Sequence, residues 1–483
     1  MILLSGASGY VGGRLLRRLE QFDAPVRCLV RFPDRLRARG FRSELIQADL
    51  LDPASLAAAF DGVDIAFYLV HSMNDGPGFE AFERQCALNF AAAARAAGVK
   101  RIIYLGGLAQ GDGLSSHMRS RAETGALLRS TGIPVIEFRA SIVIGSGSAS
   151  FEMIRALVDK LPLMITPRWV NTDAQPIAIE DVVAYLLEAI TIDLPHSMTV
   201  EIGGQDVTTY SGIMEEYARQ RGFRRTILRV PFLSLSLSSR WLTLITPLYA
   251  RIGRYLIDSV RHPSVVLDPV PAERFQVRPM GVREAIGRAM SNEANPLPES
   301  RWSDASSGAA VEQPIADQSG ATLRNEQTVR VPLSPDLAFE PIRRIGGRQG
   351  WYFGNSLWQI RGLVDLMMGG VGMRRGRPDP ETPLVGNTLD FWRVEAYEPA
   401  RRLRLRAEMK VPGQAWLEFR AEPCEGGTQL HQVAQFAPSG PFGWLYWYVL
   451  WPVHEWMFRG MLRNIRAEAV RRSKAQARAV AAA

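Results

Sequence analysis

Residues Ile2–Gly12 read ILLSGASGYVG, a short apolar run followed by three glycines, each three positions after the last. An apolar run of this length predicts a buried strand, and the residues that follow have the periodicity of a helix. In such a strand–turn–helix unit, Gly6 would allow a tight turn and Gly9 would let a pyrophosphate approach the backbone. Gly12 would let the helix pack on the sheet. The stretch therefore predicts a phosphate-binding loop.

The same alternation of strand and helix patterns continues to about residue 140. Because helices lie between the short apolar strands, we predict an α/β fold with a doubly wound parallel sheet. Residues 141–290 continue with mixed elements, which we expect to cap the sheet on the substrate side. The predicted strands are Ile2–Ser5, Val26–Val30, Leu45–Ala48, Ile65–Val70, Ile102–Leu105 and Val135–Phe138.

The composition changes after residue 290. Residues 291–327 are rich in Ser, Ala, Gly, Pro, Glu and Gln, which is typical of a flexible linker. Strict alternation in Arg402–Lys410 then predicts half-buried antiparallel strands, and a long helix is expected over Glu455–Arg472. We predict a first domain at 1–290, a smaller α+β domain at 328–466 and a basic, Ala-rich tail at 467–483.

Charge and cysteine content narrow the classes of protein. The chain of 483 residues has 57 Lys and Arg against 49 Asp and Glu, a net charge of +8, and only four of the cations are Lys. The guanidinium groups of arginines recognise phosphate and carboxylate, so the excess of arginine could indicate an anionic partner. The simpler explanation of the excess is that these arginines lie on solvated surfaces. Cys28, Cys86 and Cys424 lack metal-ligand spacing, so we expect no metal, no disulfide framework and a cytoplasmic location. No nucleic-acid-binding module is expected.

The end of the second predicted strand bears on the choice of nicotinamide cofactor. Arg31 stands where an acid would accept hydrogen bonds from a ribose diol, and Arg35 follows four residues later. A guanidinium at this position suits a 2′-phosphate, which favours NADP(H), unless Arg31 is only a solvated strand end. Asp49 and Leu50 follow the third strand, where an adenine amino group could be met. Asp49 could equally cap the next helix.

These segments, together with Gln175–Val182 (QPIAIEDV), resemble the atypical short-chain dehydrogenase/reductase family and, more narrowly, its NmrA-like NAD(P)-binding branch. The resemblance covers about residues 1–290. It implies a Rossmann fold with bound NAD(P)(H). The contacts that it implies come from Gly6, Ser8, Gly9, Tyr10, Gly12, Arg31, Asp49 and Leu50, and we add His71, which follows the fourth strand.

The catalytic pattern of the wider family is altered. Active members use Tyr-x-x-x-Lys, whereas Ser115–Arg121 reads SSHMRSR and places His117 and Arg121 at those two positions. The fifth strand ends in Leu-Gly-Gly without the usual Ser. Either His117 donates a proton while Arg121 holds ribose or substrate, with His71 contributing from the opposite wall, or the site only binds the dinucleotide.

The C-terminal residues resemble an uncharacterised bacterial domain fused to such Rossmann proteins, and its pattern is similar to the START or polyketide-cyclase helix-grip fold. That likeness implies a curved sheet around an apolar cavity. Three arginines in a glycine-rich loop, Arg374, Arg375 and Arg377, could hold an anionic head group or be solvated. Four Trp within residues 444–456 suit either peripheral contact with a membrane or a buried helix that lines the cavity.

The leading hypothesis is an NADP(H)-dependent oxidoreductase that acts on a bulky apolar substrate. Two alternatives stay open: a non-catalytic sensor or scaffold that binds NADP(H), and a carrier of a small apolar or amphipathic ligand in which the nucleotide is structural.

Overall fold

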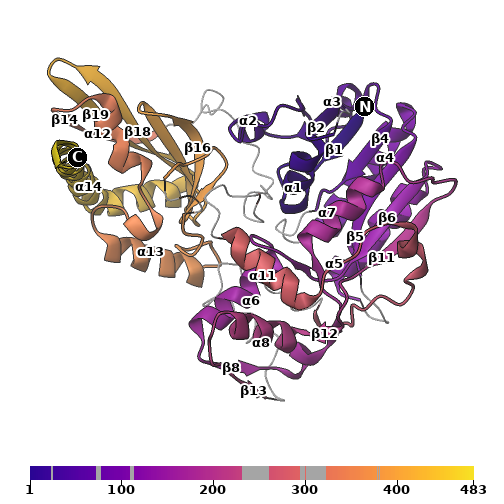
Figure 1. Ribbon diagram of the computed structural model, residues 1–483. Coiled ribbons are helices and arrows are strands. Elements are labelled where there is room, and N and C mark those ends of the chain that lie inside the picture. Colours follow the sequence, from indigo (N-terminus) through magenta and orange to yellow (C-terminus); the bar gives the residue numbers. More distant parts are fainter. Residues whose placement is uncertain are drawn as a thin grey trace. The chain divides into compact units, whose positions relative to one another are not determined.

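The computed structural model describes residues 1–22, 25–71, 78–108, 114–230, 260–293, 300, 322–377, 379 and 381–482. The chain divides into two compact units, Met1–Ala309 and Ala310–Ala483 (Figure 1). Each unit has its own hydrophobic core.

A parallel seven-stranded sheet forms the centre of the first unit, in the order β11-β6-β5-β4-β1-β2-β3. The order reverses between β1 and β4, which is the place where open α/β sheets bind ligands at the carboxyl ends of their strands. This confirms the predicted doubly wound sheet. The strands are β1 Ile2–Ser5, β2 Val26–Val30, β3 Glu44–Gln47, β4 Ile65–Tyr68, β5 Arg101–Gly107, β6 Val135–Ala140 and β11 Met198–Ile202.

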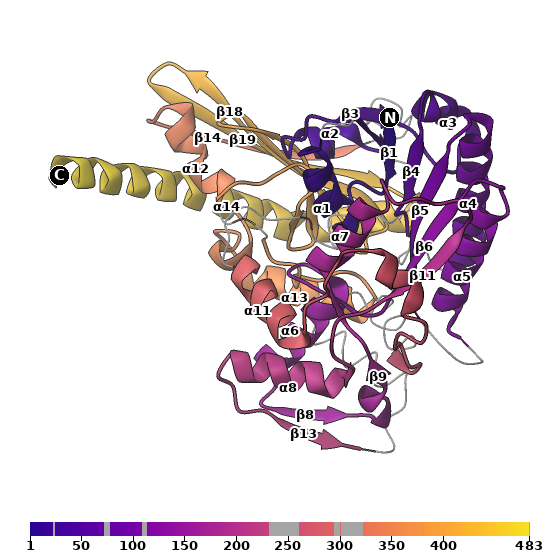
Figure 2. The same ribbon diagram turned by 45° about the vertical axis from the view of Figure 1, so that its right-hand side comes forward.

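Helices cover both faces of this sheet. Figure 2 shows α1 (Tyr10–Leu19) and α7 (Ile179–Glu188) on one face. The other face carries α3 (Pro53–Phe60), α4 (Phe79–Ala96) and α5 (Ser116–Arg129). The helices bury apolar stripes against the inner strands of the sheet, β1, β2, β4, β5 and β6, which are almost wholly buried, as expected for a parallel sheet. A short helix, α2 (Pro33–Arg37), follows β2.

A second cluster of elements in the first unit lies beyond the carboxyl edge of the sheet. Its helices pack around a core that includes Ile154, Val158, Ile213, Tyr217 and Ile286. The elements are β7 Val143–Ile144, α6 Ala149–Lys160, β8 Leu163–Thr166, η1 Arg168–Asn171, β9 Asp173–Ala174, β10 Ile177–Ala178, β12 Thr208–Thr209, α8 Tyr210–Gln220, β13 Thr226–Arg229 and α11 Val282–Glu293. The short helix η2 (Val270–Arg274) packs on β11 of the central sheet instead.

The second unit contains an antiparallel six-stranded sheet in the order β14-β19-β18-β17-β16-β15. In β17 the two leucines, Leu403 and Leu405, are fully buried, while the arginines that alternate with them, Arg402 and Arg404, ion-pair with Glu418 and Glu395 on the other face. The elements are β14 Leu323–Val331, α12 Pro335–Arg343, η5 Gly347–Gln349, α13 Asn355–Met367, β15 Thr388–Leu389, β16 Trp392–Glu398, β17 Arg402–Ala407, β18 Gly413–Cys424, β19 Gly427–Pro438 and α14 Gly440–Ala482.

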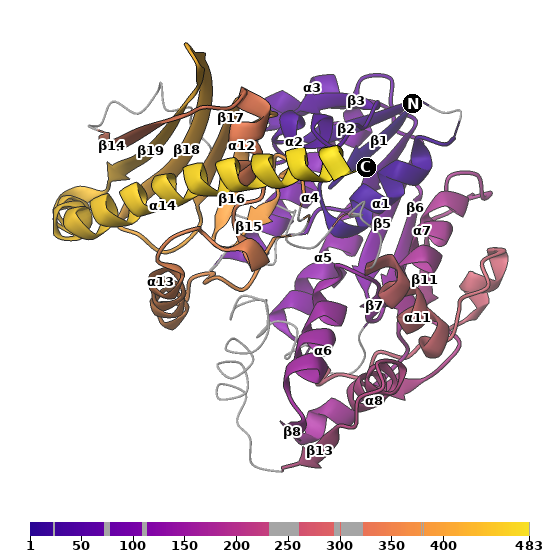
Figure 3. The same cartoon turned by 60° about the vertical axis from the view of Figure 1, so that its left-hand side comes forward.

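Two elements of this unit cross the predicted boundaries. β14 begins at Leu323, inside the predicted linker, because its polar residues are satisfied within the fold: buried Asn325 donates to Glu455 on α14. Helix α14, shown along its length in Figure 3, begins at Gly440 and includes the predicted tail. Ala-rich sequence and pairs such as Glu468–Arg472 favour helix there. In the described part of the chain, no helix is both long and apolar enough to cross a bilayer.

The arginine-rich loop of the second unit is held by partners within that unit. Arg375 is buried in an ion pair with Glu408, and Arg377 donates to the carbonyls of Ile345 and Arg343 at 2.7 and 2.6 Å. These two guanidinium groups therefore stabilise the loop rather than present a site for a head group.

Candidate functional site

The glycine loop has the geometry that its sequence predicts. Gly6 has φ +81°, and a Cβ atom there would lie 2.5 Å from the carbonyl oxygen of Leu69, after β4. A Cβ atom on Gly12 would lie 2.2 Å from the Gly6 oxygen, so only glycine fits at either position. Gly9, whose amide donates to the Gly6 carbonyl at 2.9 Å, stands at the N-cap of α1 without a side-chain cap. The first amides of α1 therefore suit a pyrophosphate.

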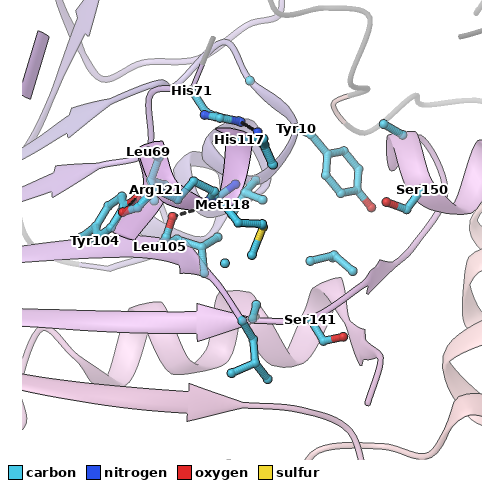
Figure 4. A pocket seen from close by; sticks show the side chains of 18 of the residues that line it. Tyr10, Leu69, His71, Tyr104, Leu105, His117, Met118, Arg121, Ser141 and Ser150 are labelled. Atoms are coloured by element: carbon cyan, nitrogen blue, oxygen red, sulfur yellow. Dashed lines mark hydrogen bonds between the residues drawn. The ribbon is translucent and has the colours of Figure 1, made fainter. Parts of the chain in front are cut away.

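A cavity of about 300 Å³ begins at this loop and extends along the carboxyl ends of β4, β5 and β6 (Figure 4). Of the predicted cofactor residues, Gly9, Tyr10, Gly12 and His71 line it. His117 and Arg121 line it as well, so the structure brings both predicted catalytic residues beside the loop. Gly6 and Ser8 lie in the loop itself, outside the lining.

The predicted adenosine contacts lie outside the lining of this cavity. Arg31 follows β2, whose carboxyl end is next to that of β1, and its guanidinium is 5.9 Å from the centre of the Phe32 ring. Arg35 is buried and stacks on the same ring at 4.5 Å, so it is held against the protein. Asp49 accepts the Leu51 amide at 3.0 Å and does not cap α3, whose cap is Asp52. Leu50 is buried, and its carbonyl accepts from Asn89.

Four side chains form a hydrogen-bonded chain at the wall of the cavity. The Nε2 atom of His71 lies 3.2 Å from the Nδ1 atom of His117, and the two rings are 4.6 Å apart. On its other side, His71 forms an ion pair through Nδ1 with the buried carboxylate of Glu83. Glu83 also accepts a hydrogen bond from the hydroxyl of Ser120 on α5. Two histidines from different elements are therefore coupled to one buried acid.

The surroundings of His117 keep its ring neutral. Burial, followed by the positive charge on His71 and Arg121, holds the pKa of His117 well below its usual range. A neutral imidazole that is hydrogen-bonded to a second histidine through one ring nitrogen can give up a proton from its other ring nitrogen.

Sequence reasoning did not identify Glu83. It lies on α4 in a stripe of buried residues with Phe79, Cys86, Ala87 and Phe90. A carboxylate within an apolar helical stripe is the signal that could have found it, because a buried charge requires a partner.

Arg121 is fixed by the end of β5. Its Nη2 atom donates to the Leu105 carbonyl at 2.6 Å, and its own carbonyl accepts from the Tyr104 hydroxyl at 2.9 Å. The Nε atom is buried and has no acceptor among the residues that the structure describes. The hydroxyl of Tyr10 is likewise buried without a hydrogen-bond partner among the described residues, and burial raises the pKa of Tyr10. Two buried donors at the wall of one cavity fit a ligand that accepts hydrogen bonds there.

The rest of the cavity wall is mainly apolar. Figure 4 shows the two histidines on one side and Ser141 on the opposite side, where its hydroxyl lies 2.7 Å from that of Ser264. The apolar lining includes Leu69, Leu105, Met118, Ile142 and Val143. Among the described residues, no group of three His, Cys, Asp or Glu side chains could hold a metal ion.

The segment Gln175–Val182 connects the sheet to the elements that cap it. Gln175 donates to the Gly204 carbonyl at 2.7 Å and accepts the Val266 amide at 3.0 Å. Asp181 accepts the Met280 amide at 2.8 Å. This motif positions the cap and does not line the cavity.

Comparison with known proteins agrees with this geometry. A family model described as NAD(P)H-binding matches residues 6–130, and a model of a family of unknown function matches residues 318–461. The chain is 32% identical over 177 residues to the (4-alkanoyl-5-oxo-2,5-dihydrofuran-3-yl)methyl phosphate reductase of Streptomyces griseus, covering 35% of this chain and 59% of that protein. It is also 32% identical over 111 residues to the NAD(P)H azoreductase of Xenophilus azovorans, and this match covers 22% of this chain and 36% of that protein. The chain thus spans less than two thirds of the length of either relative.

Among solved structures, the NADPH-dependent quinone oxidoreductase of Escherichia coli, in complex with NADPH, matches with a TM-score of 0.50 at 20% identity. The match covers 60% of this chain and all of that chain, and it shows a shared fold. The first unit thus contains an NAD(P)H-binding domain of the Rossmann type, with reductases among its relatives.

Proposed function

We propose that the first unit is an NADPH-dependent reductase of an apolar, conjugated substrate, with His117 as the proton donor. The observation that carries this proposal is the chain Glu83–His71–His117, which meets the cavity beside the glycine loop. A site that only bound a dinucleotide would have no need for two histidines coupled to a buried acid.

The cofactor would be held at three points. The glycine loop and the first amides of α1 would bind the pyrophosphate, and Arg31 would meet a 2′-phosphate at the end of β2. Asp49 and Leu50 would lie beside the adenine. Bound NADPH supplies a hydride to the substrate.

The chain's own residues would supply the matching proton. The Glu83 carboxylate accepts from Nδ1 of His71, and Nε2 of His71, when it carries a proton, would donate to Nδ1 of His117. When the Nε2 atom of His117 gives its proton to the substrate, Nδ1 of His117 receives the proton from Nε2 of His71. His117 is then neutral again, His71 has become neutral, and the substrate has gained one hydride and one proton.

Arg121 would bind rather than react. Its bond to the Leu105 carbonyl fixes the guanidinium, and its buried Nε atom would donate to a ribose hydroxyl or to the substrate oxygen. It would thus take the binding role of the family's lysine without its acid–base role.

The wall of the cavity favours an apolar substrate with few acceptor atoms. By their names, the two curated relatives reduce an alkanoyl-oxo-dihydrofuran methyl phosphate and azo compounds, and the structural relative reduces quinones. A planar conjugated acceptor is the class that these share.

We assign the second unit a supporting role. Its order of strand, two helices, five-strand meander and long helix is similar to the helix-grip fold, which suits a unit that presents or retains an apolar ligand. Mass spectrometry of an apolar extract from the purified protein tests this role. A unit that never retains such a ligand contradicts it.

The test of the main proposal combines binding and turnover. We expect NADPH to bind more tightly than NADH by nicotinamide fluorescence, and to be oxidised with a member of a panel of quinones and conjugated ketones. The His117→Ala variant should lose at least 100-fold in kcat and keep its NADPH affinity. Unchanged turnover would remove His117 from the mechanism. Tight NADPH binding without turnover on any acceptor would favour the sensor hypothesis.

A further inference from the structure

Helix α13 exposes a continuous apolar stripe. Its large apolar side chains are spaced as on one face of a helix, and the exposed fraction of Met367 is 72%. The opposite face of the helix packs inward through Trp358, Gly362 and Asp365. The stripe consists of Ile360, Leu363, Val364, Met367 and Met368.

The first third of α14 is also apolar toward the solvent. Between Pro441 and Val453 it has no charged residue, and the exposed fractions of Phe442 and Val449 are 79% and 63%. Trp447 faces the core, but the other three Trp are exposed by more than a third. The alternative that this segment is a buried cavity wall was therefore wrong for most of its side chains.

The two helices are neighbours in the same unit. Phe353, just before α13, packs edge-to-face on Trp456 of α14 at 4.8 Å, and Gly354 lies against Met457. Further along, burial and, to a smaller extent, the charge of Arg361 on α13 lower the pKa of His454 on α14. We call the exposed apolar side chains of α13 and of α14 up to Trp456 the apolar face.

Basic groups adjoin this face, whereas the acids of both helices are engaged. Lys410 is exposed, and its carbonyl accepts from Arg361. Arg463 is exposed two turns beyond Trp456, and Arg459, one turn beyond it, is exposed but paired with Glu455. Asp365 is fully buried and accepts two backbone amides, and Glu455 binds Asn325, Gln327 and Arg459.

We propose that the apolar face binds the surface of an anionic phospholipid membrane. Trp and Tyr side chains, with an apolar ring and a polar tip, suit the boundary between headgroups and acyl chains, and the adjoining cations suit anionic headgroups. Residues 440–456 span only about 25 Å at 1.5 Å per residue, so this segment lies in the interface rather than across the bilayer. An apolar surface of this kind on a folded domain requires an occupant, and the basic margin selects an anionic one.

The test is flotation of the full-length protein with vesicles of phosphatidylcholine alone, or with 30% phosphatidylglycerol. We expect flotation with the anionic vesicles and at least tenfold less with the neutral ones. The triple variant Phe442→Ser/Leu445→Ser/Val449→Ser should lower binding at least tenfold, because these side chains are exposed and pack little in the fold. Arg459→Glu/Arg463→Glu should remove the preference for anionic lipid. The matched control is Leu267→Ser, an equally exposed apolar side chain in the first unit, which should bind like the wild type.

A second measurement does not depend on the variants. Brominated phosphatidylcholine within anionic vesicles should quench part of the tryptophan fluorescence of the wild-type protein. Failure to float with either vesicle overturns the proposal. Light scattering gives a second way to overturn it. If the wild-type protein is a dimer, the triple variant is a monomer, and neither protein binds vesicles, then the apolar face is occupied by a second copy of the chain.

Discussion

The Nε2 atom of His71 lies 3.2 Å from the Nδ1 atom of His117, across the space between the loop after β4 and helix α5. The strand order reverses next to β4, so this contact lies beside the glycine loop that follows β1. It links the nucleotide-binding part of the fold to a buried acid, Glu83, and thereby places acid–base groups where an NAD(P)H-binding fold holds its ligand.

The first prediction concerns Glu83. Replacing Glu83 by Gln leaves a side chain of the same shape without the negative charge that faces Nδ1 of His71. We expect kcat to fall 10- to 100-fold with a much smaller change in NADPH affinity, since the carboxylate acts through His71. Glu80→Gln, on the same helix but exposed and weakly paired with Arg119 at 3.7 Å, is the control. Equal loss in both variants would argue for a general effect on α4.

The second prediction concerns the glycine loop. In Gly12→Ala the new Cβ atom would lie 2.2 Å from the Gly6 carbonyl, so the loop must shift. We expect NADPH affinity to fall at least tenfold and the free energy of unfolding of the first unit to fall by about 1–3 kcal/mol. Gly287→Ala in α11 is the control, where the nearest atom is a side-chain oxygen at 3.4 Å. Calorimetric titration and urea unfolding measure the two effects, and full NADPH affinity in Gly12→Ala would contradict the assigned role.

The third prediction separates the two nicotinamide cofactors. Arg31→Ala should weaken NADPH binding about 10- to 100-fold, because a charge-assisted contact with the 2′-phosphate is worth about 1.5–3 kcal/mol. NADH binding should stay the same. The control is Arg37→Ala on α2, an exposed arginine paired with Asp34 at 2.8 Å. If both cofactors lose affinity equally, the 2′-phosphate is not the partner of Arg31.

The sequence was sufficient to predict the sheet of the first unit and the glycine loop. Local signals define both: β1 and β2 begin and end at the predicted residues, and Gly6 and Gly12 fill positions that admit no Cβ. The pairing of Glu83 with His71 could not be predicted in this way. It depends on how α4 docks beside the loop after β4, and spacing along the chain does not encode that contact.

The start of α14 was missed for a different physical reason. Helix prediction relies on one apolar face and one polar face, and residues 441–453 are apolar on the exposed side as well as the buried side. The periodicity is clear only beyond Glu455, where inward residues such as Met461 and Ile465 alternate with exposed arginines. The exposed apolar residues that hide the start of α14 from helix prediction also belong to the apolar face.

The last prediction concerns pH and the stability of the second unit. Burial, with a smaller contribution from Arg361, lowers the pKa of His454 to about 4, whereas an unfolded histidine titrates near 6.5. The unfolded state therefore binds more protons between these values, so stability is fully present above about pH 6.5 and is lost as the pH falls toward 4. We expect a loss of about 2 kcal/mol, less than the full shift implies, because the ring is only partly shielded from solvent.

His454→Phe should keep the packing on Trp447 and Phe458 and flatten this dependence. Urea unfolding at pH 7 and pH 4.5, followed by tryptophan fluorescence, measures the difference, and an equal loss in wild type and variant would assign the pH dependence to other groups.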